Sequence, residues 1–220
     1  MDRHPSIRER ILADIVSGAH AFGARLTIDE LASRYGASHM PVREALRELQ
    51  GAGILEIGQG RSARVRTFDV HFVENLFATR SALEVMLVRS AAQHCRSAQI
   101  HALRRIEDEL EAHLARHDYT GVLQANRRLH SAINDIAANS EAVAIIDRHW
   151  LLIAALWQRV GYAPDRYGAV VSDHRHLLRA FSLGDVDAAG VLMGAHVIKA
   201  KYELLERMAA SVGGRDGAAA

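Results

Sequence analysis

Histidine and asparagine side chains stand at spacings that could bind a metal ion. The segment NRRLH places Asn126 four residues before His130, which puts both side chains on one face of a helix. His174 and His196 lie in later segments of helical pattern, and neutral imidazole is the commonest protein ligand for zinc and related ions. Spacing alone does not require the three segments to converge, so one shared site and separate buried histidines both remain open.

Most of the 13 histidines do not fit such a site. His174 and His176 are two residues apart, so on a helix their side chains point about 160° from each other. We therefore expect only one of these two to share a site. His196 lies in an apolar stripe, where a histidine that only packs in the core is the alternative to a ligand.

A second group of residues could contact nucleic acid. The segment GASHMPVREALREL carries Ser38, His39, Met40 and Arg43 in the first turns of a helix. The free amides and positive dipole end of a helix N-terminus attract phosphate, and arginine can pair with base edges in the major groove. The alternative is a solvated helix face, in which Arg43 and Arg47 pair with neighbouring acidic residues.

A basic hairpin directly after this helix favours the nucleic-acid interpretation. Residues 34–66 contain six arginines and three acidic residues, although the formal charge of the whole chain is only +1. Arg61 and Arg64 would extend the basic surface into a wing that contacts the DNA backbone or minor groove.

Two capping boxes predict the first helices that must position these residues. Ser6 with Glu9 starts one helix, and Thr27 with Glu30 starts a second. Gly36 should end the second helix in a left-handed conformation.

A third helix and a two-stranded hairpin follow. Ser38 can cap this helix, and its buried stripe is predicted to be Val42, Ala45, Leu46 and Leu49. A strand over 54–57, a glycine-containing turn and a second strand then form the hairpin, with Ala63 and Val65 on one face and arginines on the other.

Beyond residue 68 the pattern is helical throughout. The predicted helices cover 69–95, 97–116, 120–138, 141–161, 165–183 and 185–208. We therefore predict a mainly α protein with a DNA-binding domain over 1–67, an all-α domain over 68–210 and a disordered tail over 211–220.

Composition limits the cellular setting. The single cysteine, Cys95, excludes an internal disulfide and fits a reducing compartment. The N-terminal segment lacks the apolar core of a signal peptide, and no apolar run of 18 residues occurs, so we expect a cytoplasmic protein without a membrane partner.

The N-terminal segment resembles the winged helix-turn-helix domain of GntR-type transcription regulators. The resemblance covers residues 7–67 and includes the S-x-x-P-V-R-E-A-L recognition helix and a wing-tip glycine, Gly60. It implies a double-stranded DNA operator as partner. The residues we expect to contact DNA are Arg34, Ser38, His39, Met40, Arg43, Arg47, Gly60, Arg61 and Arg64.

Two positions depart from this family pattern at the expected DNA surface. His39 stands where an arginine is common, and Asp29 stands where many members have a basic residue. Both changes should weaken the hold on phosphates or alter the preferred operator.

Residues 68–208 resemble the FCD effector domain of the FadR-type branch of these regulators. In that family a D/N-x-x-x-H pair and two later histidines bind one divalent metal ion. The resemblance assigns Asn126, His130, His174 and His196 as ligands, with zinc as the expected metal and nickel or manganese as alternatives.

Charge at such a site would favour an anionic effector. Three neutral imidazoles and an amide leave a divalent ion at about +2, so a small carboxylate could complete the ligand set. Arg80 is a candidate second contact for that carboxylate, and a salt bridge with Glu84 is the alternative.

These observations predict a homodimeric, ligand-responsive transcription regulator, acting as a repressor on a pseudo-palindromic operator. One alternative is a metal-dependent enzyme acting on a small organic acid, but no acidic residue stands at a general-base spacing such as His-Glu-x-x-His. Another is a regulator whose metal is only structural.

Overall fold

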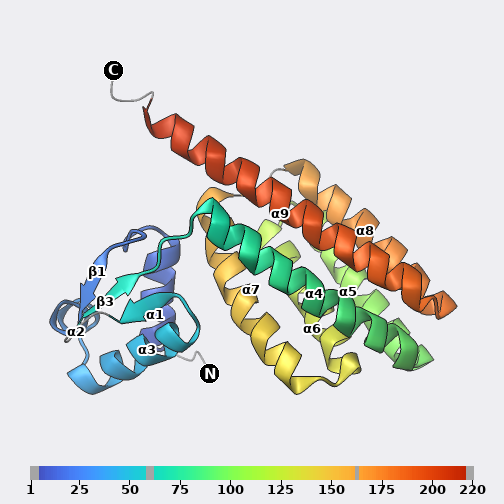
Figure 1. Ribbon diagram of the computed structural model, residues 1–220, viewed down its shortest axis with the longest axis horizontal. Coiled ribbons are helices and arrows are strands. Elements are labelled where there is room, and N and C mark those ends of the chain that lie inside the picture. Colours follow the sequence, from blue (N-terminus) through green and yellow to red (C-terminus); the bar gives the residue numbers. More distant parts are fainter. Residues whose placement is uncertain (1–4, 58–61, 162–163, 217–220) are drawn as a thin grey trace. The chain divides into compact units, whose positions relative to one another are not determined.

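The computed structural model describes residues 5–57, 62–161 and 164–216 of the 220-residue chain. The chain divides into two compact units. The first unit comprises Met1–Phe72 with Trp150–Gly161, and the second comprises Val73–His149 with Tyr162–Ala220 (Figure 1). No helix in the described ranges combines the length and the apolar character needed to cross a bilayer.

Three short helices lie in the N-terminal part of the first unit. They are α1 (Ile7–Val16), α2 (Ile28–Tyr35) and α3 (His39–Gly51). Both predicted capping boxes are formed, at the starts of α1 and α2. Gly36 ends α2 with φ of 62°, a left-handed conformation that costs glycine little because it has no Cβ.

Helix α3 begins after Ser38, as predicted, but the Ser38 side chain makes no capping hydrogen bond. The prediction that its hydroxyl caps the helix was therefore wrong, while the start of the helix was right. The predicted stripe of Val42, Ala45, Leu46 and Leu49 is buried. It packs with α1 residues such as Ile11 and Ile15 in the core of this unit.

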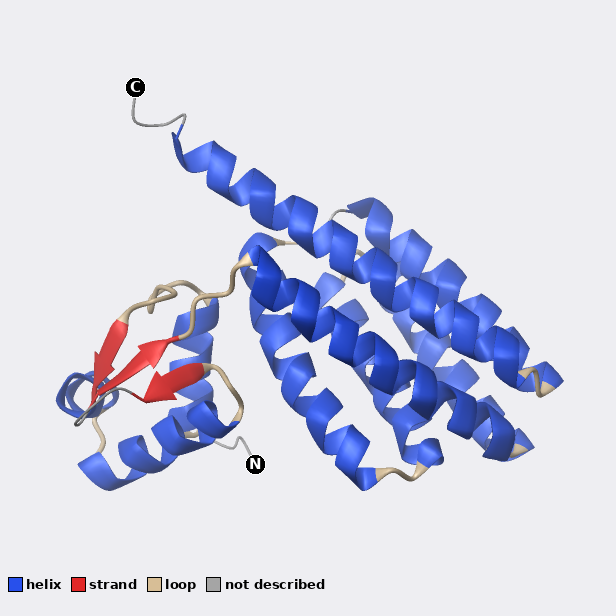
Figure 2. Ribbon diagram, in the orientation of Figure 1, coloured by secondary structure: helices blue, strands red, loops and turns tan. Residues whose placement is uncertain are grey.

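The β-structure is a three-stranded antiparallel sheet rather than the predicted two-stranded hairpin (Figure 2). The strands are β1 (Arg25–Thr27), β2 (Leu55–Ile57) and β3 (Ser62–Val65), in the order β1-β3-β2. Leu26 pairs with Ala63 across β1 and β3, and both side chains are buried. The predicted alternation in β3 is confirmed, since Ala63 and Val65 are buried and Arg64 is exposed.

Long helices make up the remainder of the described chain. They are α4 (Val70–His94), α5 (Ser97–Ala115), α6 (Tyr119–Ala137), α7 (Ser140–Val160), α8 (Pro164–Leu183) and α9 (Val186–Asp216). Helix α5 packs against α6 and α8, and α8 packs against α9. The mainly α fold class is confirmed.

Helix α9 continues past Met208 to Asp216, so the predicted tail over 211–220 is helical in its first part. A glycine in a helix costs about 1 kcal/mol relative to alanine, and two of them in this segment do not by themselves end a helix. Residues 217–220 lie outside the described residues. The domain boundary at 67/68 remains a prediction.

Candidate metal centre and nucleic-acid interface

Three buried histidines meet inside the second unit. His130 comes from α6, His174 from α8 and His196 from α9. One ring nitrogen from each lies within 4.8 Å of the others, and the ring centroids are 5.0–5.6 Å apart. Three separate helices therefore bring together the histidines that the resemblance selected.

His176 lies on the opposite side of α8 from this cluster. It is exposed, and its Nδ1 donates to the backbone carbonyl of Ser172 at 2.7 Å. The expectation that His174 and His176 would not share a site agrees with this arrangement.

A carboxylate accepts a hydrogen bond from Nδ1 of each clustered histidine. Glu84 accepts from His130 at 3.1 Å, Glu107 from His174 at 2.8 Å, and Asp173 from His196 at 3.3 Å. A carboxylate partner places the proton on Nδ1, so the Nε2 lone pair of each ring is directed toward the cluster. Protein metal sites commonly orient histidine ligands in this way.

Electrostatics favours neutral imidazoles in the cluster. Burial lowers the pKa of His196 to about 3, although the hydrogen bond to Asp173 opposes that change. Burial also lowers the pKa of His130, against the attraction of Glu84. Only neutral imidazole can bind a metal, so His130 and His196 are in the required form at neutral pH.

Buried polar atoms without partners show that the residues fit a metal ion. Asn126 Oδ1 and His174 Nε2 are both buried, and neither has a hydrogen-bond partner among the described residues. Such atoms are uncommon because an unmet hydrogen bond in the interior costs about 1–3 kcal/mol. Asn126 lies one helical turn before His130 on α6, so an ion held by the imidazoles could also be bound by its amide oxygen.

Arg80 forms the salt bridge that was the alternative to effector binding. Its Nε lies 2.5 Å from Oε1 of Glu84, and both side chains are almost fully buried. Arg80 therefore supports the carboxylate behind His130. A direct contact between Arg80 and an effector remains a prediction.

The expected DNA surface is exposed along the start and outer face of α3. Ser38, His39, Met40, Arg43 and Arg47 are all exposed, and Met40 is 64% exposed despite its apolar side chain. The buried stripe of α3 faces the opposite side, so these residues are available to a partner of the first unit.

Other candidate DNA contacts are held by neighbouring groups. Arg34 donates to Asp14 Oδ2 at 2.8 Å and so links α2 to α1, while Arg64 donates to the Gly23 carbonyl at 2.6 Å. His39 and Asp29, the two departures from the family pattern, are in contact, with His39 Nε2 3.2 Å from Asp29 Oδ1. No sequence pattern indicated that these two residues would pair. Gly60 and Arg61 lie outside the described residues.

Sequence reasoning also missed the three carboxylates behind the histidines. Glu84, Glu107 and Asp173 belong to three different helices, and no short motif joins them to their partners. One signal was present for Glu107, which falls between Leu103 and Leu110 on the core-facing side of α5. An acidic residue at a core position needs a polar partner, and this requirement could have singled it out.

Comparisons with known proteins agree with both halves of this description. Residues 5–65 match the family of bacterial regulatory proteins called gntR, and residues 74–199 match the FCD domain. The HTH-type transcriptional regulator BphR of Paraburkholderia xenovorans is 34% identical over 140 residues, which cover 61% of this chain and 56% of that protein. The Uxu operon regulator of Haemophilus influenzae is 24% identical over 219 residues, covering 91% and 81%.

Solved structures show the same fold. The structure of McbR/YncC from E. coli superposes with a TM-score of 0.75 at 20% identity, covering 92% of this chain and 96% of that one. The Listeria monocytogenes regulator Lar superposes with a TM-score of 0.71 at 15% identity, covering 93% and 99%. These relatives are transcription regulators and not enzymes. With a matching DNA-binding domain and a matching FCD domain in one chain, the protein belongs to the GntR family of bacterial transcription regulators.

Proposed function

We propose that the protein is a ligand-responsive repressor that binds a pseudo-palindromic operator as a homodimer and senses a small carboxylate at a divalent metal ion. The observation that carries the proposal is the cluster of His130, His174 and His196, each backed by a carboxylate. Asn126 completes the donor set. Nitrogen-rich donors of this kind favour zinc, with nickel and manganese as alternatives.

The residues of the chain have separate tasks in this proposal. Glu84, Glu107 and Asp173 hold the imidazoles by their Nδ1 atoms, and burial of the cluster excludes water. When bound, a divalent ion supplies a Lewis-acidic position for a carboxylate oxygen. The effector can regulate DNA binding only if it has different affinities for the DNA-competent and DNA-incompetent arrangements.

Metal content tests the site directly. The protein is purified without a histidine tag or chelator, and bound metal per chain is measured by mass spectrometry for the wild type, His174→Ala and His176→Ala. We expect about one ion per wild-type chain, loss of that ion in His174→Ala and its retention in His176→Ala, because His176 is exposed on the other side of α8. Metal-free wild-type protein, even after addition of zinc, nickel or manganese, would overturn the proposed sensor site.

DNA recognition is tested on operator fragments selected from random sequence. Arg43→Ala should weaken specific binding about 5- to 150-fold, since a good arginine–base contact contributes about 1–3 kcal/mol. Arg127→Ala, which removes an exposed arginine of α6, is the matched control and should leave the affinity unchanged. Full operator discrimination by Arg43→Ala would refute the assignment of α3 as the recognition helix.

The response of DNA binding to an effector distinguishes a sensing role of the metal from a purely structural one. Operator affinity of the metal-loaded protein is measured with and without a panel of small mono- and dicarboxylates. A carboxylate that changes the affinity in the wild type but not in His174→Ala supports sensing. Thermal stabilisation by metal without any carboxylate-dependent change in DNA affinity would favour the structural alternative.

A further inference from the structure

An apolar side chain stands on the exposed face of the recognition helix. Met40 lies in the first turn of α3 and is 64% exposed. Arg43 and Arg47, farther along the same helix, are exposed as well. The exposed face of α3 therefore combines positive charge with a large apolar group.

Helical geometry places Met40 almost opposite the core of the first unit. Successive residues of a helix are about 100° apart, so the direction of Met40 is about 170° from the centre of the buried stripe of α3. Arg43 and Arg47 lie about 60° and about 20° to one side of Met40. A recognition helix enters the major groove with its N-terminal residues toward the base edges. Met40 is therefore the foremost side chain of α3, with the arginines beside it.

The residue before Met40 turns to the side. His39 Nε2 lies 3.2 Å from Oδ1 of Asp29, which belongs to the first turn of α2. His39 is about 100° around the helix from Met40, and its contact with Asp29 directs the imidazole toward α2. Met40 therefore keeps its exposure, and a base edge that approaches the start of α3 meets the thioether side chain.

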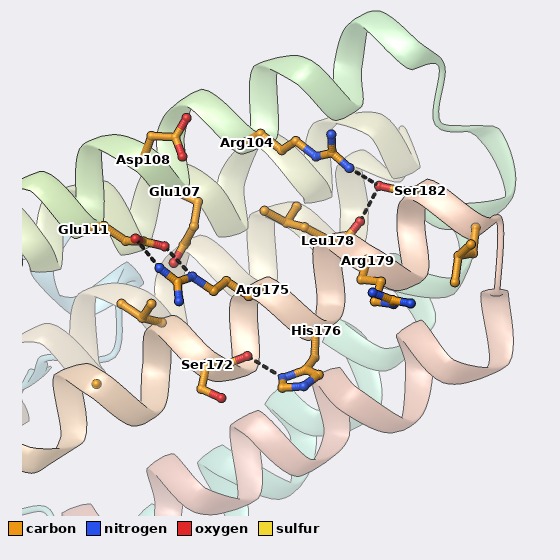
Figure 3. Close-up of a pocket in the computed structure, with 13 residues that line it drawn as sticks. Arg104, Glu107, Asp108, Glu111, Ser172, Arg175, His176, Leu178, Arg179 and Ser182 are labelled. Carbon is orange, nitrogen blue, oxygen red and sulfur yellow. Dashed lines mark hydrogen bonds and ion pairs between the residues drawn. The ribbon is translucent and has the colours of Figure 1, made fainter.

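Exposed polar groups can find partners within the chain, as the groove between α5 and α8 shows (Figure 3). There Arg175 donates from two nitrogens to the carboxylate of Glu111, at 2.7 and 2.5 Å, and Arg104 donates to the Ser182 hydroxyl at 2.7 Å. Methionine has no hydrogen-bond donor, and its sulfur is only a weak acceptor. The exposed part of Met40 loses its contact with water only against an apolar group of another molecule.

We propose that Met40 contacts the 5-methyl group of a thymine in the major groove, and so selects T·A at one position of each operator half-site. The methyl group of thymine is the apolar group that base edges present in this groove. Methionine suits it, because three rotatable bonds let the side chain adjust to the methyl position. The inference rests on the proposed binding of a pseudo-palindromic operator by a homodimer.

Replacement of thymine by deoxyuridine tests the contact. Deoxyuridine pairs with adenine in the same way but lacks the methyl group. Each thymine of the operator selected from random sequence is replaced in turn, at both symmetry-related positions, and affinity is measured by fluorescence anisotropy. For the wild type we expect one such pair of replacements to weaken binding about fifteenfold, or about fourfold for each half-site, from the hydrophobic contribution of one methyl group.

Variants of the protein assign this effect to Met40. In Met40→Ala the same pair of replacements should change the affinity by less than about twofold, because the partner of the methyl group is gone. Met40→Leu keeps an apolar side chain and should remain sensitive to the pair. Met86→Ala, which truncates a 41% exposed methionine of α4, is the matched control and should show the full effect.

Three results would overturn the inference. One is an operator in which no replacement of thymine weakens binding by the wild type. Another is a methyl effect of equal size in the wild type and in Met40→Ala, because a different residue would then contact the methyl group. Both leave the proposed DNA recognition standing. The third is failure to enrich any operator from random sequence, which would refute that recognition as well.

Discussion

At the scale of single residues, the carboxylates behind the histidines should set the affinity of the proposed site for metal. Asp173 accepts from His196 Nδ1 and also from Lys199. Replacing such a partner typically costs 10- to 100-fold in metal affinity. The identity of the ligands is thus only part of what makes this cluster suited to an ion.

Asp173→Asn should reduce zinc affinity by about 10- to 100-fold while leaving the helical fold intact. The amide can still accept a hydrogen bond from His196, but it no longer stabilises positive charge that develops on the imidazole. A competition titration against a chromophoric chelator measures the change. Lys199→Ala is the matched control and should have a smaller effect, because Lys199 is more than half exposed. Equal zinc affinities for wild type and Asp173→Asn would contradict this role.

The pair of Asp29 and His39 should act as one unit when DNA binds. Asp29→Ala removes a negative charge near phosphates and releases His39, so operator affinity should rise about three- to tenfold. The same change in a His39→Ala background should have a smaller effect, with a coupling of at least ~0.5 kcal/mol. Fluorescence anisotropy on the selected operator measures all four proteins.

Glu48→Ala supplies the control for this comparison of single and double variants. Glu48 lies on α3 but pairs with Arg8 rather than with His39. Its effect should add to that of Asp29→Ala, since the two residues share no partner. Additive effects of Asp29→Ala and His39→Ala would mean that the contact between these two residues has no part in recognition.

At the scale of elements, a polar network links α1 to α2 in the first unit. Asp14 on α1 accepts hydrogen bonds from Tyr35 and Arg34 on α2, each at 2.8 Å. Burial opposes ionisation of Asp14, but these hydrogen bonds outweigh it and lower the pKa of the carboxyl below 3.8. Burial and the hydrogen bond with Asp14 raise the pKa of Tyr35 to about 12, so its hydroxyl stays a donor at neutral pH.

Asp14→Asn should therefore destabilise the first unit by about 1 kcal/mol at pH 7. Because the folded-state pKa is lowered, the stabilisation by ionised Asp14 is present above its unfolded pKa and is lost as pH falls through the folded-state value. The difference between wild type and variant should shrink below about pH 4. Thermal unfolding of both proteins between pH 7 and pH 3 measures it, and a difference independent of pH would assign the effect to lost packing.

Local patterns predicted the helices well and the sheet only in part. Ser6–Glu9 and Thr27–Glu30 act within one turn of chain, so their capping boxes can be read from the sequence. Strand β1 has three residues, and its last residue, Thr27, is also the cap of α2. Its partner strand is far away in the sequence, and no short-range pattern predicts that pairing.

The candidate metal site, too, could be predicted from local sequence patterns only in part. Asn126 and His130 form a motif because they lie on one helix, whereas His174 and His196 were assigned through family resemblance. The partners Glu84 and Glu107 are set by how α4, α5, α6 and α8 pack, which depends on many side chains at once. Spacing therefore identifies candidates, and only packing shows which of them meet.

At the scale of the whole molecule, the proposed dimer needs an apolar surface. Val191, Ile198 and Tyr202 are exposed on α9, and their spacing of seven and four residues places them on one face. Ile198 also lines a groove of about 390 Å³ with Ala78 and Ala82 of α4. Exposed apolar stripes of this kind commonly mark interfaces between subunits, and a pseudo-palindromic operator requires two-fold symmetry.

Ile198→Arg should shift the protein from dimer to monomer and reduce operator affinity at least tenfold, because a charge in an apolar interface loses its hydration. Light scattering coupled to gel filtration measures the mass in solution. Leu183→Arg is the control, since Leu183 is 71% exposed but belongs to α8 and not to the α9 stripe. A dimeric Ile198→Arg protein would place the subunit interface elsewhere.

The scarcity of lysine has a practical consequence for chemical labelling of this protein. Of 27 basic residues, only Lys199 and Lys201 are lysines, and Lys199 is paired with Asp173 directly behind His196. An amine-reactive acylating label can therefore attach at only these two side chains and at the amino terminus. Lys201 is on the same helix two residues away and can serve as the reference for Lys199. The ratio of modification at the two lysines would therefore report changes around the histidine cluster without any engineered probe.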